Sequence, residues 1–241
     1  MKIFICDGAP ESFFTAVFEA YKQTDCVITS DGNIQLSLNC ETERVQRDSE
    51  KCERVRRGLN RYDDGAEEDI LKALRSCNAQ KEQICFKYIK RIFEYKKRVR
   101  TAYNLPEVVD LSNILYQITE ETHRFTGFLR FKETADGTYY APYSPDNDIT
   151  ELLMPHFAER LNMPFIIHDI KRKIAGIYNG QCWITANVGE AEICLSDSEK
   201  AFERLWKKYY KAVNIESRPH EKQMKGSMPV RYWKFLPEKN D

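Results

Sequence analysis

The sequence predicts an α+β protein in which a mostly antiparallel sheet packs with helices, plus a helical section in the N-terminal half. Short runs of apolar, β-branched and aromatic residues occur near the start of the chain and again after residue 127. Between them, in roughly residues 41–122, Gly and Pro are rare and apolar residues return at helical spacing. We therefore expect residues 1–241 to form a single α+β unit. Residues 41–122 are either a helical subdomain inserted into it or a layer packed on its sheet.

The first residues predict a strand followed by a helix. Residues 2–6 (KIFIC) are mostly apolar and end at an Asp-Gly turn. Pro10 suits the first turn of a helix, because its φ angle is already close to the helical value. Residues 26–29 (CVIT) and 34–38 (IQLSL) flank turn residues at 31–33, so they predict a second, hairpin-like pair of strands.

Residues 84–100 carry the clearest local charge feature of the chain. On a helix, the cationic side chains lie opposite an apolar stripe; these are Lys87, Lys90, Arg91, Lys97 and Arg98. A continuous basic face suits contact with nucleic-acid phosphates, because each neutralised phosphate releases condensed counterions. The alternative is a solvated helix face whose charges have no specific partner.

The second half begins with a predicted hairpin. Residues 127–133 and 138–143 are two apolar and aromatic runs on either side of Gly137. Because side chains alternate along a strand, Arg130 and Lys132 share one face of the first run. They add positive charge to that edge of the sheet.

A helix and three short strands are predicted next. The side-chain oxygens of Asp146, Asn147 and Asp148 suit capping of the first backbone N–H groups of the helix. His156 shares the apolar side of that helix, which predicts a buried, hydrogen-bonded histidine. The Asn179-Gly180 dipeptide predicts a tight hairpin between the last two strands. The three strands are expected at residues 164–170, 174–178 and 181–186.

The last predicted helix follows Ser196 and has a regular apolar stripe. Trp206 and Tyr209 belong to that stripe, and at this spacing we expect them in the core rather than stacked on bases. The segment 228–234 brings the large apolar area of Tyr232 and Trp233, which predicts that it packs against the body of the protein. Arg231 is expected at the rim, in reach of phosphate.

Several stretches resemble a bacterial family that is assigned to DNA metabolism. They include HRFTGFLRF from His123, YYAPYSPDND from Tyr139 and MPVRYWKFLPE from Met228, and with the DGAPESFF start the resemblance spans essentially the whole chain. It implies a neighbouring radical-SAM protein associated with DNA modification or repair. A similar domain is fused to uracil-DNA glycosylases. The resemblance thus implies a DNA context without supplying a reaction.

On these grounds the leading hypothesis is an accessory protein of DNA repair or modification. It would bind DNA and supply substrate or scaffold to a radical-SAM or glycosylase-type partner. The residues expected to contact phosphate are Lys87, Lys90, Arg91, Lys97, Arg98, Arg130, Lys132 and Arg231.

Two other classes of function stay open. One is an enzyme, either a metal-dependent nuclease or an acid/base nucleotide hydrolase, carried by Asp146, Asp148, His156 and Asp169. That hypothesis requires these side chains to converge on one open pocket. The other class is a protein-interaction partner that makes no DNA contact.

Composition narrows these classes only a little. The formal net charge is +0, so only local patches can favour nucleic acid. No apolar run is long enough to span a membrane and no signal peptide is recognisable, which predicts a cytoplasmic protein without a membrane partner. None of the 8 cysteines stands in a Cys-x-x-Cys pair, so we expect free thiols and no metal or cofactor. A cluster shared with a partner stays open. Walker, Rossmann and radical-SAM motifs are absent from the sequence.

Overall fold

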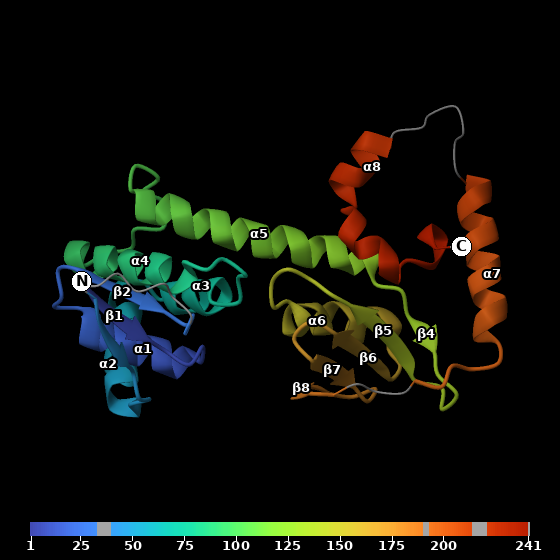
Figure 1. Cartoon of the computed structure of the whole chain (residues 1–241), viewed down its shortest axis with the longest axis horizontal. Coiled ribbons are helices and arrows are strands. Elements are labelled where there is room, and N and C mark those ends of the chain that lie inside the picture. The colour runs from blue at the N-terminus through green and yellow to red at the C-terminus, as the bar shows by residue number, and fades with distance from the viewer. Residues whose placement is uncertain (33–39, 190–192, 214–220, 241) are drawn as a thin grey trace. The chain divides into compact units, whose positions relative to one another are not determined.

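The computed structural model describes residues 1–32, 40–189, 193–213 and 221–240. The chain divides into two compact units, Met1–Thr119 and Glu120–Asp241 (Figure 1). The long helix α5 (Pro106–Phe128) contains the boundary between them.

The first unit contains a parallel sheet of three strands among its described residues, in the order β2-β1-β3. The strands are β1 (Lys2–Ile5), β2 (Cys26–Thr29) and β3 (Glu41–Arg44). Helix α1 (Pro10–Ala20) joins β1 to β2 and starts with Pro10 in its first turn, as predicted. Phe13, Phe14 and Val17 of α1 are buried with Ile3 and Phe4 of β1, and they are part of the core of this unit.

The predicted single, mostly antiparallel sheet is wrong, because the α+β chain has this separate parallel sheet. The physical reason is the connection: α1 returns the chain to the end where β1 began, so β2 runs in the same direction as β1. The predicted hairpin partner of residues 26–29 was residues 34–38, which lie outside the described residues. Residues 26–29 themselves pair in parallel with β1.

Helices occupy most of residues 49–128. They are α2 (Ser49–Tyr62), α3 (Ala66–Ala73), α4 (Lys81–Tyr95) and α5. Asp48 caps α2 by accepting a hydrogen bond from the Lys51 N–H at 3.1 Å. α2 packs against α1 and α4, and α4 packs on β2. The helical section therefore begins after β3 and extends six residues beyond its predicted end at residue 122, to Phe128.

The second unit contains a mixed sheet in the order β4-β5-β6-β7-β8. β5 and β6 are parallel because helix α6 (Thr150–Leu161) joins them, and the other neighbouring strands are antiparallel. The predicted hairpin at Asn179-Gly180 is confirmed, with Gly180 at φ +96 between β7 and β8. The strands are β4 (Lys132–Glu133), β5 (Tyr139–Tyr143), β6 (Phe165–Asp169), β7 (Ile174–Tyr178) and β8 (Trp183–Asn187).

The hairpin around Gly137 is shorter than predicted. Its paired residues are Lys132 with Tyr140 and Glu133 with Tyr139, and Gly137 has φ +83. The start of the predicted strand is wrong, because α5 continues to Phe128. α6 covers one face of this sheet, and Met154 fills the space beside Gly176, where a β-carbon would collide with its sulfur.

The C-terminal elements are α7 (Glu199–Val213), α8 (Glu221–Ser227) and the 3₁₀ turns η1 (Val230–Phe235) and η2 (Pro237–Lys239). The predicted docking of the segment around Tyr232 is confirmed: Tyr232 and Leu236 are buried, and the Tyr232 ring centroid lies 4.7 Å from that of Phe125. Within the part of the chain that the structure describes, no helix has both the length and the apolar character to cross a membrane.

Candidate functional site

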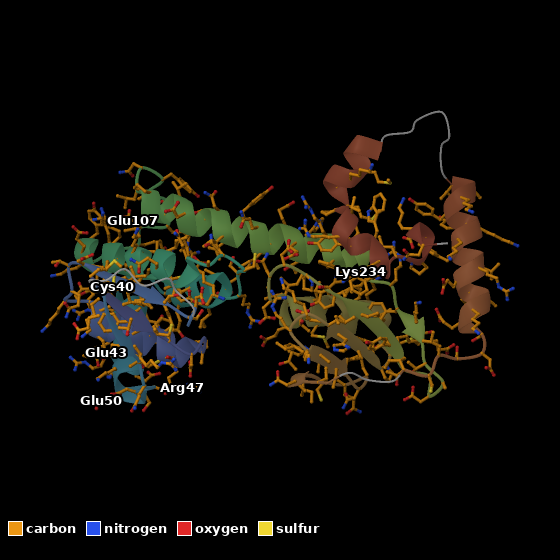
Figure 2. The ribbon with its side chains drawn as sticks, in the orientation of Figure 1. Cys40, Glu43, Arg47, Glu50, Glu107 and Lys234 are labelled. Carbon is orange, nitrogen blue, oxygen red and sulfur yellow. The ribbon has the colours of Figure 1, made fainter. Side chains whose placement is uncertain are left out.

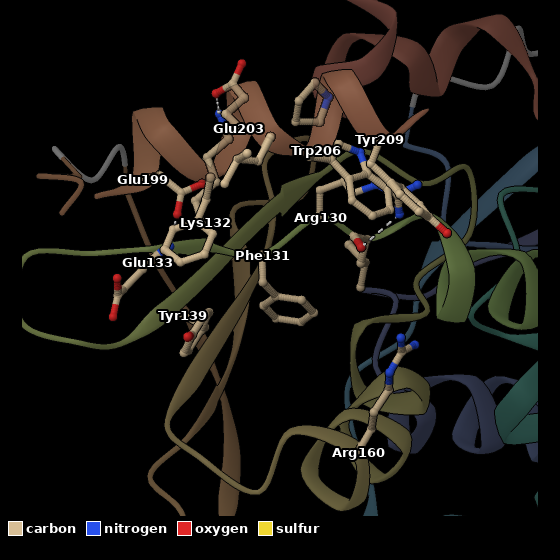
Figure 3. A pocket seen from close by; sticks show the side chains of 14 residues that line it. Arg130, Phe131, Lys132, Glu133, Tyr139, Arg160, Glu199, Glu203, Trp206 and Tyr209 are labelled. Carbon is tan, nitrogen blue, oxygen red and sulfur yellow. Dashed lines mark hydrogen bonds and ion pairs between the residues drawn. The ribbon is translucent and has the colours of Figure 1, made fainter. Parts of the chain in front are cut away.

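A groove of about 600 Å³ lies in the second unit between α7 and the segment Leu129–Glu133 (Figure 3). α7 forms one wall, and the segment that follows α5, together with β4, supplies the other. Tyr139 of β5, Arg160 of α6 and Pro237 of η2 complete the lining. Pockets of this size accommodate ligands of a few hundred daltons.

Aromatic rings line both walls of the groove. Phe202, Trp206 and Tyr209 come from α7, and Phe131 and Tyr139 come from the opposite side. Phe202 is 61% exposed and Tyr209 is 58% exposed. The prediction that Trp206 and Tyr209 lie in the core is therefore wrong. Helical periodicity correctly gathers apolar residues on one side of α7, but that side faces the groove instead of packed side chains.

Trp206 is held in one orientation by contacts from distant parts of the chain. Its indole Nε1–H donates to Glu238 Oε2 at 2.8 Å, and Arg130 Nη2 donates to Glu238 Oε1 at 2.7 Å. The Arg130 guanidinium also lies 5.2 Å from the Trp206 ring centroid, within range of a cation–π interaction. Tyr209 continues the aromatic surface, with its ring centroid 5.8 Å from that of Trp206.

The lining is electrically balanced. Lys132 Nζ lies 3.6 Å from Glu203, and Glu199 accepts a hydrogen bond at 2.9 Å from the backbone N–H of Glu133. Among the described residues of the lining, cationic and acidic side chains are equal in number: Arg130, Lys132 and Arg160 against Glu133, Glu199 and Glu203. The groove thus offers aromatic surface with little net charge.

Glu238 links the groove to the C-terminal segment. Burial alone would raise the pKa of its carboxyl group, but hydrogen bonds from Arg130 and Trp206 outweigh burial and hold the pKa below the ordinary value of 4.5. A depressed carboxyl pKa stabilises the fold above pH 4.5, and this contribution is lost as pH falls through the folded-state pKa.

We therefore expect Glu238→Gln to be less stable than wild type at pH 7, with the difference shrinking as pH falls below the ordinary value of 4.5. Glutamine can still accept the Trp206 hydrogen bond but cannot carry the charge that faces Arg130. Urea unfolding of both proteins from neutral to acidic pH measures the difference. A stability gap that stays constant over this range would contradict the charge-dependent role of Glu238.

A known family model matches most of the chain. Residues 79–238 match the model of DUF4130, a domain of unknown function. The chain belongs to this family. The DUF4130 region contains every residue that lines the groove, whereas residues 1–78 lie outside it. No curated protein and no solved structure matches the chain.

The predicted basic face of residues 84–100 is not a single helix face. α4 ends at Tyr95 because Lys96 adopts a left-handed conformation with φ 51, so Lys97 and Arg98 lie beyond the helix. Arg91 pairs with Glu94 at 2.7 Å and with Glu107 at 2.9 Å (Glu107 is labelled in Figure 2).

The remaining cations of this stretch differ in their contacts. Arg98 pairs with the buried Asp63 at 3.2 Å and also with Asp64. Lys90 donates to the Gln23 carbonyl at 3.4 Å. Lys87 and Lys97 are exposed. The two arginines of this predicted basic face are thus already engaged by carboxylates of their own unit.

Two predicted phosphate contacts of the DUF4130 region, Arg130 and Lys132, line the groove. Arg231 lies elsewhere, paired with Asp146 at 2.5 Å and 4.7 Å from the centroid of the Tyr232 ring. It is exposed, as expected for a residue at the rim of the C-terminal segment.

The four candidate catalytic residues do not line the groove. Asp146 does not cap α6 as predicted, because its carboxylate pairs with Arg231, and the N-cap residue is Ile149. Asp148 is half-buried. His156 is exposed beside the ring of Phe157, so its predicted burial is wrong. The described residues include no group of three or more His, Cys, Asp or Glu side chains placed to hold a metal ion.

Asp169 belongs to a turn network at the end of β6. It is fully buried and accepts hydrogen bonds from the backbone N–H of Lys171 at 3.0 Å and from Arg172 Nη1 at 2.8 Å. The neighbouring His168 is also buried, with Nδ1 2.8 Å from the Tyr140 hydroxyl oxygen, and burial lowers the pKa of its imidazole. The carboxylate of Asp169 therefore stabilises this turn through its hydrogen bonds.

Glu121 is a residue that sequence reasoning missed. It is 7% exposed, and its two oxygens accept hydrogen bonds from the backbone N–H groups of Asp146 (2.7 Å) and Asn147 (2.8 Å), from Asn147 Nδ2 (2.7 Å) and from the Tyr232 hydroxyl (2.7 Å). A signal for it exists: Glu121 stands at a buried position of the stripe Ile114, Ile118, Phe125. A lone acid in an apolar stripe indicates a buried carboxylate with several donors.

Proposed function

We propose that this protein binds nucleic acid through the α7 groove and serves as an accessory protein in DNA repair or modification. The observation that carries the proposal is the lining of the groove, where exposed aromatic rings lie beside Arg130, Lys132 and Arg160. Aromatic platforms with nearby cations are typical of sites that bind nucleic acid without sequence readout. The resemblance noted in the sequence supports a radical-SAM or glycosylase-type partner, and a cytoplasmic location belongs to the same proposal.

The groove is a better candidate than the cationic residues of the first unit. Phosphate contact by Arg91 or Arg98 would require exchange of carboxylate partners that already lie within 3.2 Å. In the groove, Lys132 is held by a long 3.6 Å ion pair with Glu203, and Arg160 donates to the Thr126 carbonyl at 3.3 Å. Both side chains can turn toward a phosphate at lower cost.

The proposal is tested by measuring DNA binding over a salt series. We expect affinity at low salt with a shallow dependence on salt concentration. The two lining cations that can turn toward phosphate, Lys132 and Arg160, correspond to a slope of about −1.4 to −1.8 in log K against log salt. Lys132→Ala should make the slope less steep by about 0.7. Lys87→Ala is the matched control, since Lys87 is an exposed lysine in the other unit, and it should leave the slope unchanged.

Absence of binding at low salt, or an affinity without salt dependence, would contradict direct DNA contact. If Lys132→Ala and Lys87→Ala weaken DNA binding equally, the phosphate contact does not lie specifically in the groove. Arg231→Ala separately tests the predicted phosphate contact of that residue, which lies outside the groove.

A protein-binding role is the second candidate, and the same exposed apolar side of α7 favours it. Its test is co-purification with the radical-SAM partner after nuclease treatment. If the protein retains the partner in a preparation free of nucleic acid and shows no affinity for DNA, a protein-binding role is favoured over nucleic-acid binding.

A further inference from the structure

The apolar side of α7 is unusually open. Phe202 and Leu205 are 61% and 60% exposed, Tyr209 is 58% exposed and Trp206 is 38% exposed. All four line the groove, so they lie along one edge of the same cavity. Exposed apolar area of this kind indicates a surface that a ligand covers.

The charge of the lining restricts what that ligand is. A duplex presents phosphates and base-pair edges, while the faces of its bases are stacked inside. Because the cations of the groove are matched by carboxylates, a phosphate backbone alone gains little there. An unpaired base instead presents a flat, uncharged face, which aromatic side chains bind by stacking.

Trp206 is already oriented for such stacking. Its indole Nε1–H is fixed by Glu238 at 2.8 Å, and Glu238 is fixed in turn by Arg130 at 2.7 Å. Tyr209 follows one turn later on α7, and its ring is inclined by 36° to that of Trp206. The two rings form a ledge along the helix. Because the Trp206 side chain is already ordered in the free protein, a ligand that binds there causes a smaller loss of side-chain entropy.

The opposite wall completes the site. Figure 3 shows Phe131 and Tyr139 on the sheet side of the groove, away from the Trp206 and Tyr209 ledge, with Arg160 at one end. A base on the ledge therefore has an aromatic wall across from it and a cation near one end for its phosphate.

We infer that the groove binds unpaired bases, in single-stranded or locally opened nucleic acid, by stacking them on Trp206 and Tyr209. The inference rests on the proposed function and adds the class of ligand and the residues that select it. Phosphate contacts then contribute a smaller part of the affinity than base contacts.

The experiment compares three fluorescent probes of equal length in one buffer: a single-stranded oligonucleotide, its duplex, and a single strand with abasic sites in its central positions. The single strand should bind at least about 10-fold more tightly than either of the other two, since each stacked base contributes roughly a 5- to 150-fold gain. The abasic strand keeps the phosphates, so this arm needs no protein variant.

Tyr209→Ala and Tyr116→Ala form the matched pair of variants. Both tyrosines are exposed and helical, at 58% and 66%, but Tyr116 belongs to α5 outside the groove. Tyr209→Ala should weaken binding of the single strand by roughly 5-fold or more, and Tyr116→Ala should leave it unchanged. Trp206→Phe should retain more affinity than Trp206→Ala, because phenylalanine still offers a ring.

The outcomes separate this inference from the proposed function. Binding of all three probes with equal affinity, unaffected by Tyr209→Ala, overturns stacking and leaves the DNA-binding proposal standing. Absence of binding to every probe overturns both. The inference is supported if the wild-type protein prefers the single strand over the other two probes and the purified partner protein displaces that strand from the ledge. Partner binding at the ledge without any nucleic-acid affinity replaces it.

Discussion

Glu121→Ala should lower the free energy of unfolding of the second unit by about 4 kcal/mol or more. The substitution removes the acceptor of four hydrogen bonds, and two of the donors are backbone N–H groups at Asp146 and Asn147. Each buried donor left without a partner costs about 1–3 kcal/mol. Alanine also leaves an unfilled space beside the buried Tyr232, and an unfilled space in a packed region costs further stability.

Glu120→Ala is the matched control on the same helix. Glu120 is half-exposed and makes a 3.7 Å ion pair with Arg124, so its loss should cost about 0–1 kcal/mol. Urea denaturation of both variants, followed by circular dichroism, gives the two free energies. If the two values differ by less than about 1 kcal/mol, Glu121 does not organise the loop before α6.

The local features of this fold were predictable because each depends on a few neighbouring residues. Pro10 begins α1, and Gly137 and Gly180 adopt the positive φ angles that their turns require. The backbone preferences of proline and glycine act within one turn, so they can be recognised in a sequence without knowing what surrounds them.

The parallel sheet of the first unit was not predictable in the same way. β3 (Glu41–Arg44) has no apolar alternation, because it lies at the edge of the sheet formed by the described strands and its side chains are mostly exposed. Its position is determined by backbone hydrogen bonding to β1, in which Lys2 stands opposite Glu41. The paired residues are thus about 40 positions apart in the sequence. Pairing at such separation leaves no periodic signal in a charged strand.

The candidate site shows the same division between local and distant information. Periodicity identifies the apolar side of α7 but not its surroundings, so Trp206 was wrongly expected in the core. Cationic residues are visible in a sequence, whereas their carboxylate partners are not. Arg130 and Glu238 are separated by 108 positions, and Arg98 and Asp63 by 35. The charge available for phosphate therefore depends on tertiary contacts.

Truncation after Gly226 should lower the melting temperature of the second unit by roughly 10 °C or more. The deletion removes Tyr232 and Leu236, which are 3% and 1% exposed, and loss of a buried aromatic side chain alone costs about 3–5 kcal/mol. It also removes Glu238, so Trp206 loses its hydrogen bond and the α7 ledge loses its fixed orientation.

Two point variants show which parts of the removed segment contribute to the expected loss of stability. Tyr232→Phe keeps the ring against Phe125 but loses the 2.7 Å hydrogen bond to Glu121, so it should cost about 1–2 kcal/mol. Lys234→Ala changes an exposed residue of the same turn and should change stability by less than about 0.5 kcal/mol. Scanning calorimetry of the three proteins measures the order of the effects. A truncated protein that melts with the wild type would mean that the buried Tyr232 contributes no net stability, because its apolar burial could not then outweigh the entropy of ordering the segment.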